Sequence, residues 1–176
     1  MPRLPDLGPL WPRRTPDQIA FVVDDIGAGI RRWNALLGST DDDWLVYTYN
    51  RETVPDLSYR GAPADFSISL ALCGSSPQVE LIENVRGDSL YSEWSRAGEV
   101  GVHHLGWFVS DLTAVVADLR SRGICDVQAG SGYGAGGDGA FAYFELPGAD
   151  VVLELIEIPG QRRPSESVPT PRSARH

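Results

Sequence analysis

Hydrophobic and polar positions along the chain predict two similar series of strands and helices. The first series opens with the apolar run QIAFVV (residues 18–23), which predicts a strand. The segment IGAGIRRWNALLG has apolar residues at helical spacing, with Asp25 as its candidate N-terminal cap and Gly38 at its end, so it predicts a helix. Three further strands are expected at WLVYTY (44–49), FSISLALC (66–73) and QVELIE (78–83).

The second series has the same order. HHLGWFV (103–109) predicts a strand, and Asp111 precedes the helical pattern LTAVVADLRSRG. The segments CDVQAG, AFAYFELPG and VVLELIEI (151–158) predict three more strands. The stretch SGYGAGGDG between two of them lacks the GK[ST] ending of a phosphate loop, so it is interpreted as a flexible connection or a lid.

The two series are an internal repeat, because QIAFVVDDI matches HLGWFVSDL and QVELIE matches VLELIE. The expected fold class is therefore α+β, with one β-α-β-β-β module at residues 16–88 and another at 101–158. Residues 89–100 are expected to form a linking helix. Residues 1–15 and 159–176 are rich in Pro, Arg and Ser and are expected to be disordered tails.

Composition narrows the classes of partner. A net charge of −9 argues against nucleic acid, which would repel the protein. No apolar run approaches the ~18 residues that span a bilayer, and the proline-rich N-terminus has no hydrophobic region of a signal peptide, so no membrane partner is expected. Cys73 and Cys125 lie far apart in apolar contexts. They are interpreted as buried free thiols rather than a disulfide, which favours the reducing cytoplasm.

The repeat also aligns four polar residues. Gln18 and His104 each begin the first strand of a module, and Glu80 and Glu154 each lie in the middle of the last strand. A buried carboxylate is costly unless it is paired or bound to a cation. Strand alternation places His103 on the opposite face from His104, so His104 is the candidate metal ligand and His103 is interpreted as structural. The alternatives are a satisfied core histidine and glutamates that face solvent.

The double module resembles the vicinal oxygen chelate superfamily, which includes glyoxalase I, bleomycin-resistance proteins and extradiol dioxygenases. SEWSRAGEVGVHHLGWFVSDL and FAYFELPGADVVLELIE are similar to segments of its methylmalonyl-CoA epimerase-like branch. The resemblance covers residues 17–158. It implies one cup-shaped, barrel-like mixed sheet with helices outside.

The resemblance also implies that one divalent ion (Mn, Co, Ni, Zn, Mg or Fe(II)) is bound by Gln18, Glu80, His104 and Glu154. Epimerases of this branch have His at the first of these positions and Gln at the second. This departure puts strict methylmalonyl-CoA epimerase activity in doubt. An extradiol dioxygenase is disfavoured because it needs two histidines and one carboxylate on iron.

The chemistry that the resemblance implies is proton transfer next to a carbonyl, as in an epimerase, isomerase or lyase. Glu154 is expected to act as a ligand and base, with Glu80 as its counterpart on the other face of the substrate. Strand aromatics are candidates for the pocket wall, with core packing as the alternative for each: Trp44, Tyr47, Tyr49, Phe141 and Tyr143.

The expected partner is a small carbonyl or acyl molecule, which includes an acyl-CoA or a polyketide-like compound. Arg51, Arg60 and Arg86 are scattered and form no evident cluster for the CoA phosphates. Two other functions stay open. One is a metal-free binding protein of the bleomycin-resistance type, and the other is a tailoring enzyme of secondary metabolism. Many members of the family pair, so a homodimer is a further expected partner.

Overall fold

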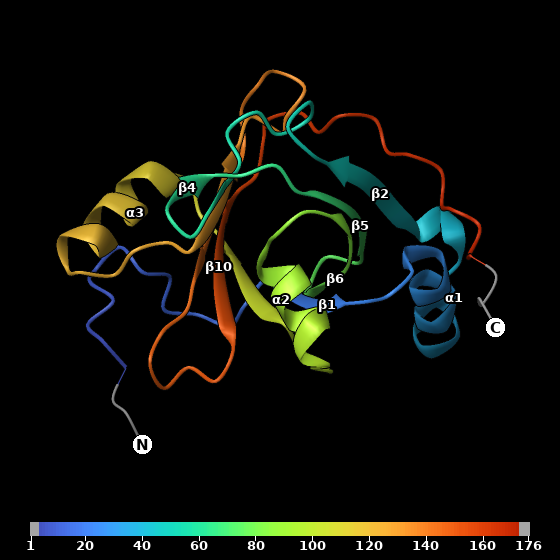
Figure 1. Cartoon of the computed structure of the whole chain (residues 1–176), viewed down its shortest axis with the longest axis horizontal. Coiled ribbons are helices and arrows are strands. Elements are labelled where there is room, and N and C mark those ends of the chain that lie inside the picture. The colour runs from blue at the N-terminus through green and yellow to red at the C-terminus, as the bar shows by residue number, and fades with distance from the viewer. Residues whose placement is uncertain (1–3, 173–176) are drawn as a thin grey trace.

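A computed structural model describes residues 4–172 as one strongly curved sheet with three α-helices outside it (Figure 1). The first module contains β1 (Gln18–Val22), α1 (Ile26–Leu37), β2 (Trp44–Tyr49), β5 (Ser67–Cys73) and β6 (Gln78–Arg86). The second contains β7 (His104–Phe108), α3 (Leu112–Ser121), β8 (Gln128–Ser131), β9 (Ala140–Phe144) and β10 (Val152–Glu157). The predicted β-α-β-β-β repeat and the α+β cup are confirmed. The helix α2 (Leu90–Ala97) links the modules.

All ten strands form one sheet in the order β2-β5-β6-β1-β7-β10-β9-β8-β3-β4. The modules meet where β1 pairs antiparallel with β7, with Ile19 opposite Leu105. β6 lies parallel to β1 on one side, and β10 lies parallel to β7 on the other. The four strands that carry the repeated polar residues, β6, β1, β7 and β10, are therefore adjacent in the interior of the sheet.

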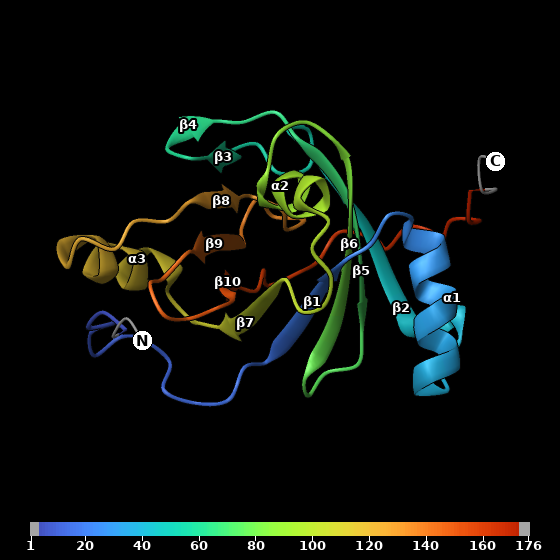
Figure 2. The same cartoon turned by 60° about the horizontal axis from the view of Figure 1, so that its bottom comes forward.

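The helices cover the convex side at the two ends of the sheet, α1 over the first module and α3 over the second (Figure 2). One buried cluster packs under α1 and includes Ile30, Trp44 and Leu81. Another packs under α3 and includes Leu119 and Leu155. The third cluster fills the inside of the cup.

The two outer helices begin in the same way. Asp25 and Asp111 are the N-caps, and each accepts a hydrogen bond from a backbone N–H three residues later at 2.8 Å. Glu83 accepts from Ile26 N and Glu157 accepts from Leu112 N, each also at 2.8 Å. The second glutamate of the repeated ELIE sequence therefore attaches each helix to the last strand of its module.

Each module also covers the edge strand of the other. β3 (Ser58–Tyr59) and β4 (Ala62–Pro63) form a hairpin from the first module, and β3 pairs with β8 of the second. The chain after β10 returns to β2 of the first module, where Glu166 forms a bridge with Val46. Neither edge element was predicted from the sequence, because both segments are too short or irregular for a periodic pattern.

The prediction of disordered tails is wrong for the described parts of both ends. Trp11 packs on Trp107 with ring centroids 5.6 Å apart, and Trp107 Nε1 donates to the carbonyl of Arg14. At the other end, Arg172 pairs with Asp25 and Glu83. Residues 1–3 and 173–176 of the predicted tails lie outside the described residues.

Cys73 is buried and free as expected, whereas Cys125 is free but exposed. Over residues 4–172, no helix has the length and apolar character to cross a membrane.

Replacement of Glu157 by Ala is expected to lower the free energy of unfolding by about 1–2 kcal/mol, because the N-terminus of α3 loses its carboxylate acceptor. Urea denaturation with EDTA present checks this without a contribution from cation binding. Glu99→Ala, at an exposed loop position, is the matched control and should change stability by less than ~0.5 kcal/mol. Equal stabilities of the two variants would contradict the role of Glu157.

Candidate metal centre

Four polar side chains, one from each of four adjacent strands, meet inside the cup. They are Gln18 of β1, Glu80 of β6, His104 of β7 and Glu154 of β10, and each is at most 7% exposed. Strand alternation turns all four inward, while their neighbours Leu81 and Leu155 point to the outer clusters. The structure thus brings together all four residues that were predicted from the sequence as candidate ligands.

The geometry of the four suits a small cation. His104 Nε2 lies 3.1 Å from Glu80 Oε2 and 3.1 Å from Glu154 Oε2. Donor atoms of these three residues all lie within 4.8 Å of one another. Ligands at about 2.1 Å from a cation are roughly 3.0–3.4 Å apart in octahedral or tetrahedral arrangements. The three side chains can therefore bind one divalent ion.

The amide of Gln18 gives an independent test of this fit. Its Nε2 donates to Gln78 Oε1 at 2.9 Å, which turns Oε1 toward the two glutamates. That amide atom lies 3.2 Å from Glu80 Oε2 and 3.2 Å from Glu154 Oε2. Three acceptor oxygens face one another, so either the amide rotates to donate to both carboxylates or a cation lies between the oxygens. Rotation of the Gln18 amide, with a matching rotation of the Gln78 amide, would also pair these atoms without a cation, so the oxygen cluster fits a cation but does not require one.

Protonation of the centre follows from burial and proximity. Burial alone would lower the pKa of His104, but the two adjacent carboxylates outweigh it and raise the pKa to about 9. Burial raises the pKa of Glu80, with His104 acting in the opposite direction. In the absence of a cation, His104 is therefore protonated at neutral pH and partly balances the two carboxylates.

His103 does not point away from the centre, and its interpretation as a purely structural residue on the opposite face is corrected. β7 begins at His104, so alternation does not govern the residue before it. His103 Nδ1 lies 2.9 Å from His104 Nδ1. Burial and the charge of His104 lower the pKa of His103 to about 3. A neutral His103 accepts a hydrogen bond from His104 Nδ1–H, which leaves His104 Nε2 directed at the cation site.

Glu154 is held by a second chain of hydrogen bonds. Tyr91 of α2 donates its hydroxyl to Tyr143 at 2.8 Å. The hydroxyl of Tyr143 is in turn hydrogen-bonded to Glu154. Trp94 of α2 also packs edge-on against His103, with ring centroids 5.1 Å apart. The linking helix therefore supports both the histidine and the carboxylate of the centre.

The predicted pocket aromatics divide between the two faces of the sheet. Tyr47, Tyr49, Phe141 and Tyr143 belong to the buried cluster inside the cup. Trp44 does not, because it lies under α1 and its Nε1 donates to Asn34 Oδ1 at 2.7 Å. The expectation that Trp44 lines the pocket is wrong. Strand alternation separates the two faces here, because Trp44 and Tyr47 are three residues apart on β2 and therefore point to opposite sides of the sheet.

Two cavities that share lining residues lie at the centre and beside it. The inner one has a volume of about 30 Å³ and is lined by Gln18, Glu80 and Glu154 together with Tyr49, Tyr133 and Arg162. The outer one has a volume of about 200 Å³, and both share Tyr49, Tyr133 and Arg162. Sequence reasoning missed Tyr133 and Arg162. They come from the glycine-rich connection and from the segment after β10, neither of which has a periodic pattern.

Comparisons with known proteins agree with this architecture. The family model described as Glyoxalase/Bleomycin resistance protein/Dioxygenase superfamily matches residues 17–144. The chain therefore belongs to this superfamily. No curated protein matches the sequence.

Among solved structures, methylmalonyl-CoA epimerases share the fold. A Streptomyces coelicolor enzyme, in complex with 2-nitronate-propionyl-CoA, matches with a TM-score of 0.56 and 21% identity. The match covers 85% of this chain and 97% of that one. The Mycobacterium tuberculosis enzyme matches with a TM-score of 0.53 and 21% identity, over 81% of this chain and 87% of that one. Their likeness to this chain is one of fold.

Replacement of His103 by Phe is expected to weaken cation binding about 10–100-fold, because His104 Nδ1–H loses its acceptor. Titration of the EDTA-stripped protein with Mn²⁺, in competition with a fluorescent chelator, measures the effect. His103→Asn, which retains an acceptor oxygen, should lose less. If the Phe variant keeps its fold and binds Mn²⁺ within twofold of wild type, His103 does not position His104.

Cation binding is expected to tighten about tenfold per pH unit from pH 7 to 8.5 and to level off near pH 9. Below its pKa of about 9, His104 holds a proton where a cation would bind, so a fall in pH weakens binding. Calorimetry with Mn²⁺ in two buffers of different ionisation enthalpy should show about one proton released per ion at pH 7.5. A constant affinity between pH 7 and 9 would exclude His104 as a ligand.

Proposed function

We propose that this protein is a divalent-metal-dependent enzyme that moves a proton on the carbon next to a carbonyl, as an epimerase or isomerase of a small substrate. The observation that carries the proposal is the convergence of Gln18, Glu80, His104 and Glu154 at 3.1–3.2 Å, buried in the middle of the sheet. A protein that only sequesters an apolar ligand has no use for two buried glutamates.

The proposed chemistry divides between the cation and the two carboxylates. A bound divalent cation would hold the substrate oxygens and stabilise the negative charge that develops as the proton leaves. Glu154 is the proposed base, and its hydrogen bond from Tyr143 fixes its orientation. A carboxylate that gives one oxygen to a cation keeps the other as a proton acceptor.

Glu80 is the proposed counterpart of Glu154. The two glutamates come from β6 and β10, on opposite sides of the module boundary between β1 and β7. They therefore approach a substrate at the centre from different directions. Proton removal by one and return by the other inverts the configuration at carbon, which is the outcome of an epimerase. A lyase reaction would begin with the same proton removal.

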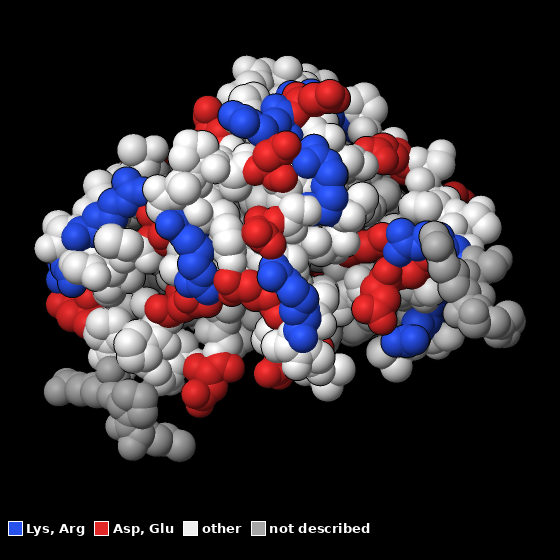
Figure 3. All heavy atoms as spheres, viewed as in Figure 1, with Lys and Arg blue, Asp and Glu red and all other residues white. Residues whose placement is uncertain are grey.

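The cavities favour a small reacting group. The inner and outer cavities hold about 30 and 200 Å³, whereas sites for drug-sized ligands are ~300–1,000 Å³. Arg60 pairs with Glu93 and Glu145, and Arg86 pairs with Asp65, so neither is free for CoA phosphates. On the face seen in Figure 3, basic and acidic side chains are interspersed. A short acyl compound is the proposed substrate class. The cytoplasm and a homodimer stay predictions from the sequence.

Wild-type protein purified without added metal is expected to contain about one divalent ion per chain, and His104→Ala is expected to contain far less. The ion-loaded wild type should catalyse deuterium exchange from ²H₂O into a member of a panel of short acyl thioesters and 2-substituted acids. Glu154→Gln should exchange about 10²–10⁴-fold more slowly. Proton NMR measures exchange, and elemental analysis of the same samples measures cation content.

Glu157→Gln is the matched control, because its carboxylate lies three residues along β10 on the opposite face and binds α3. It should retain both the ion and the exchange activity. Wild type without a stoichiometric ion would overturn the proposal. Tight ligand binding that survives EDTA and Glu154→Gln would identify a metal-free binding protein instead.

A further inference from the structure

The chain after β10 crosses the mouth of the cup as a segment anchored at both ends, here called the strap (residues 159–166). In Figure 1 it is the red trace that runs from the end of β10 toward β2. At its start, Gly160 N donates to Asp138 Oδ2 at 2.7 Å and Ala135 N donates to Gln161 O at 2.9 Å. At its end, Glu166 N donates to Val46 O at 2.8 Å.

The end of the strap is fixed by side chains as well. The carboxylate of Glu166 accepts hydrogen bonds from Thr48 N at 2.8 Å and from Thr48 Oγ1 at 3.1 Å. Ser165 Oγ accepts from Val46 N at 2.9 Å. The residues between these anchors are thereby held over the inside of the cup.

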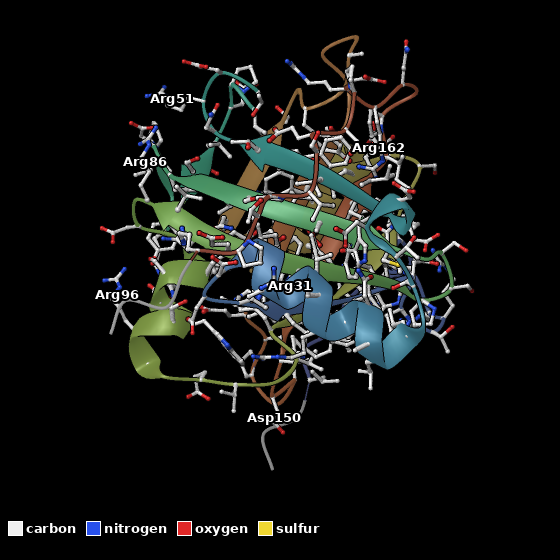
Figure 4. The ribbon with its side chains drawn as sticks, turned by 90° about the vertical axis from the view of Figure 1, so that its right-hand side faces the viewer. Arg31, Arg51, Arg86, Arg96, Asp150 and Arg162 are labelled. Carbon is white, nitrogen blue, oxygen red and sulfur yellow. The ribbon has the colours of Figure 1, made fainter. Side chains whose placement is uncertain are left out.

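Arg162 lies between the anchors and reaches the metal centre. Its guanidinium Cζ is 5.9 Å from the centroid of the Tyr47 ring. Its side chain lines the inner cavity with Gln18, Glu80 and Glu154, and it also lines the outer cavity. Figure 4 shows Arg162 apart from Arg51, Arg86 and Arg96, which lie at the other side of the view.

The charge of Arg162 is not matched by a protein carboxylate. Among residues 4–172, no Asp or Glu forms an ion pair with it, whereas Arg172, ten residues later, pairs with both Asp25 and Glu83. Its positive charge opposes the burial-induced rise in the pKa of Glu80, which places it within electrostatic reach of the centre. Both arginines of the strap, Arg162 and Arg163, line the outer cavity, but only Arg162 also lines the inner one.

The charge balance of the loaded centre gives this guanidinium a role. A divalent cation neutralises the two carboxylates of Glu80 and Glu154, and the whole chain carries −9. The loaded centre would therefore carry no net charge and would add no long-range attraction for an anion. A planar guanidinium beside the cavity supplies the missing positive charge and can bind a carboxylate through two parallel hydrogen bonds.

We propose that Arg162 is a substrate-binding residue that receives a carboxylate next to the reacting carbon, so that the protein acts on small acyl compounds that carry a free carboxylate. This rests on the proposed function and narrows its substrate class. Tyr49 and Tyr133 line both cavities with Arg162, and burial raises the pKa of each, so their hydroxyls stay protonated. The proposed receptor for the carboxylate is thus the guanidinium of Arg162, flanked by two neutral phenol hydroxyls. Arg162 lies beyond residues 17–144, which the family model matches.

The test measures binding of malonate, the simplest probe with two carboxylates, to the full-length Mn²⁺-loaded protein by calorimetry. Wild type should bind malonate at least about 30-fold more tightly than dimethyl malonate, in which both carboxylates are esterified. Arg162→Gln should lose this preference and bind malonate at least about 30-fold more weakly. Arg162→Lys, which keeps the charge, should recover part of the loss.

Arg31→Gln is the matched control, because it removes the same charge from an exposed position of α1 that lines neither cavity. It should change malonate affinity by less than threefold. Mn²⁺ affinity is measured for every variant, and Arg162→Gln should bind Mn²⁺ at least as tightly as wild type.

Three outcomes distinguish failure of the proposed function from failure of the inference about Arg162. If wild type binds no Mn²⁺, the proposed function fails, and the inference fails with it. If Mn²⁺ binds but Arg162→Gln holds malonate within threefold of wild type, the inference alone is overturned. If Arg31→Gln loses as much affinity as Arg162→Gln, general charge rather than Arg162 attracts the anion, which also overturns it.

The carboxylate can belong to a free acid or to an acyl thioester. The N-acetylcysteamine thioester of malonic acid distinguishes these sources, because it keeps one carboxylate and adds a thioester. Tighter binding of the thioester than of malonate, lost in Arg162→Gln, supports the inference with a thioester substrate. Tighter binding of malonate, lost in the same variant, supports it with a free acid.

Discussion

Two carboxylates buried against one imidazole in the centre of a sheet are the arrangement on which the rest of the structure depends. Removing such groups from water is expensive unless each charge is matched. Without a cation, burial and the neighbouring Glu154 both raise the pKa of Glu80. The surrounding groups each limit one degree of freedom: Gln78 orients the Gln18 amide, His103 fixes the tautomer of His104, and Tyr143 holds Glu154. Each of these side chains thus has a polar contact that orients it, which is what precise positioning of a reacting atom requires.

The repeat made the centre predictable from sequence. Period-two alternation and the alignment of the modules singled out Gln18, Glu80, His104 and Glu154 as matching polar positions, because regular strands fix which side chains share a face. The resemblance to a known family then implied that these four bind one ion. The same rule failed for His103, which lies one residue outside β7. Trp44 was wrongly assigned to the pocket wall. Alternation sets it on the opposite face from Tyr47, but apolar side chains on both faces do not reveal which face is the inside of the cup. Arg162 and the hairpin of β3 and β4 depend on contacts between segments far apart in the chain, which no local pattern records.

The repeated ELIE sequence shows how one short motif serves two faces of a sheet. Its two glutamates are three residues apart, so a strand directs them to opposite sides. Glu80 and Glu154 face the cup, and Glu83 and Glu157 bind the N-termini of α1 and α3. Each helix is thus tied to the strand that carries a metal ligand. Packing of the outer helices and alignment of the ligands are therefore mechanically connected within each module.

The mutual covering of edge strands has a consequence for how the two modules depend on each other. A module alone would expose one side of β2 or β8, with unpaired N–H and C=O groups that can pair with another chain. In the intact protein, β3 covers β8 and the strap covers β2, so each half protects the other from association. An ancestral single module would have found the same protection only in a second copy of itself. Duplication within one chain makes that pairing permanent and frees the two copies to diverge, one contributing an amide and the other an imidazole to the shared centre.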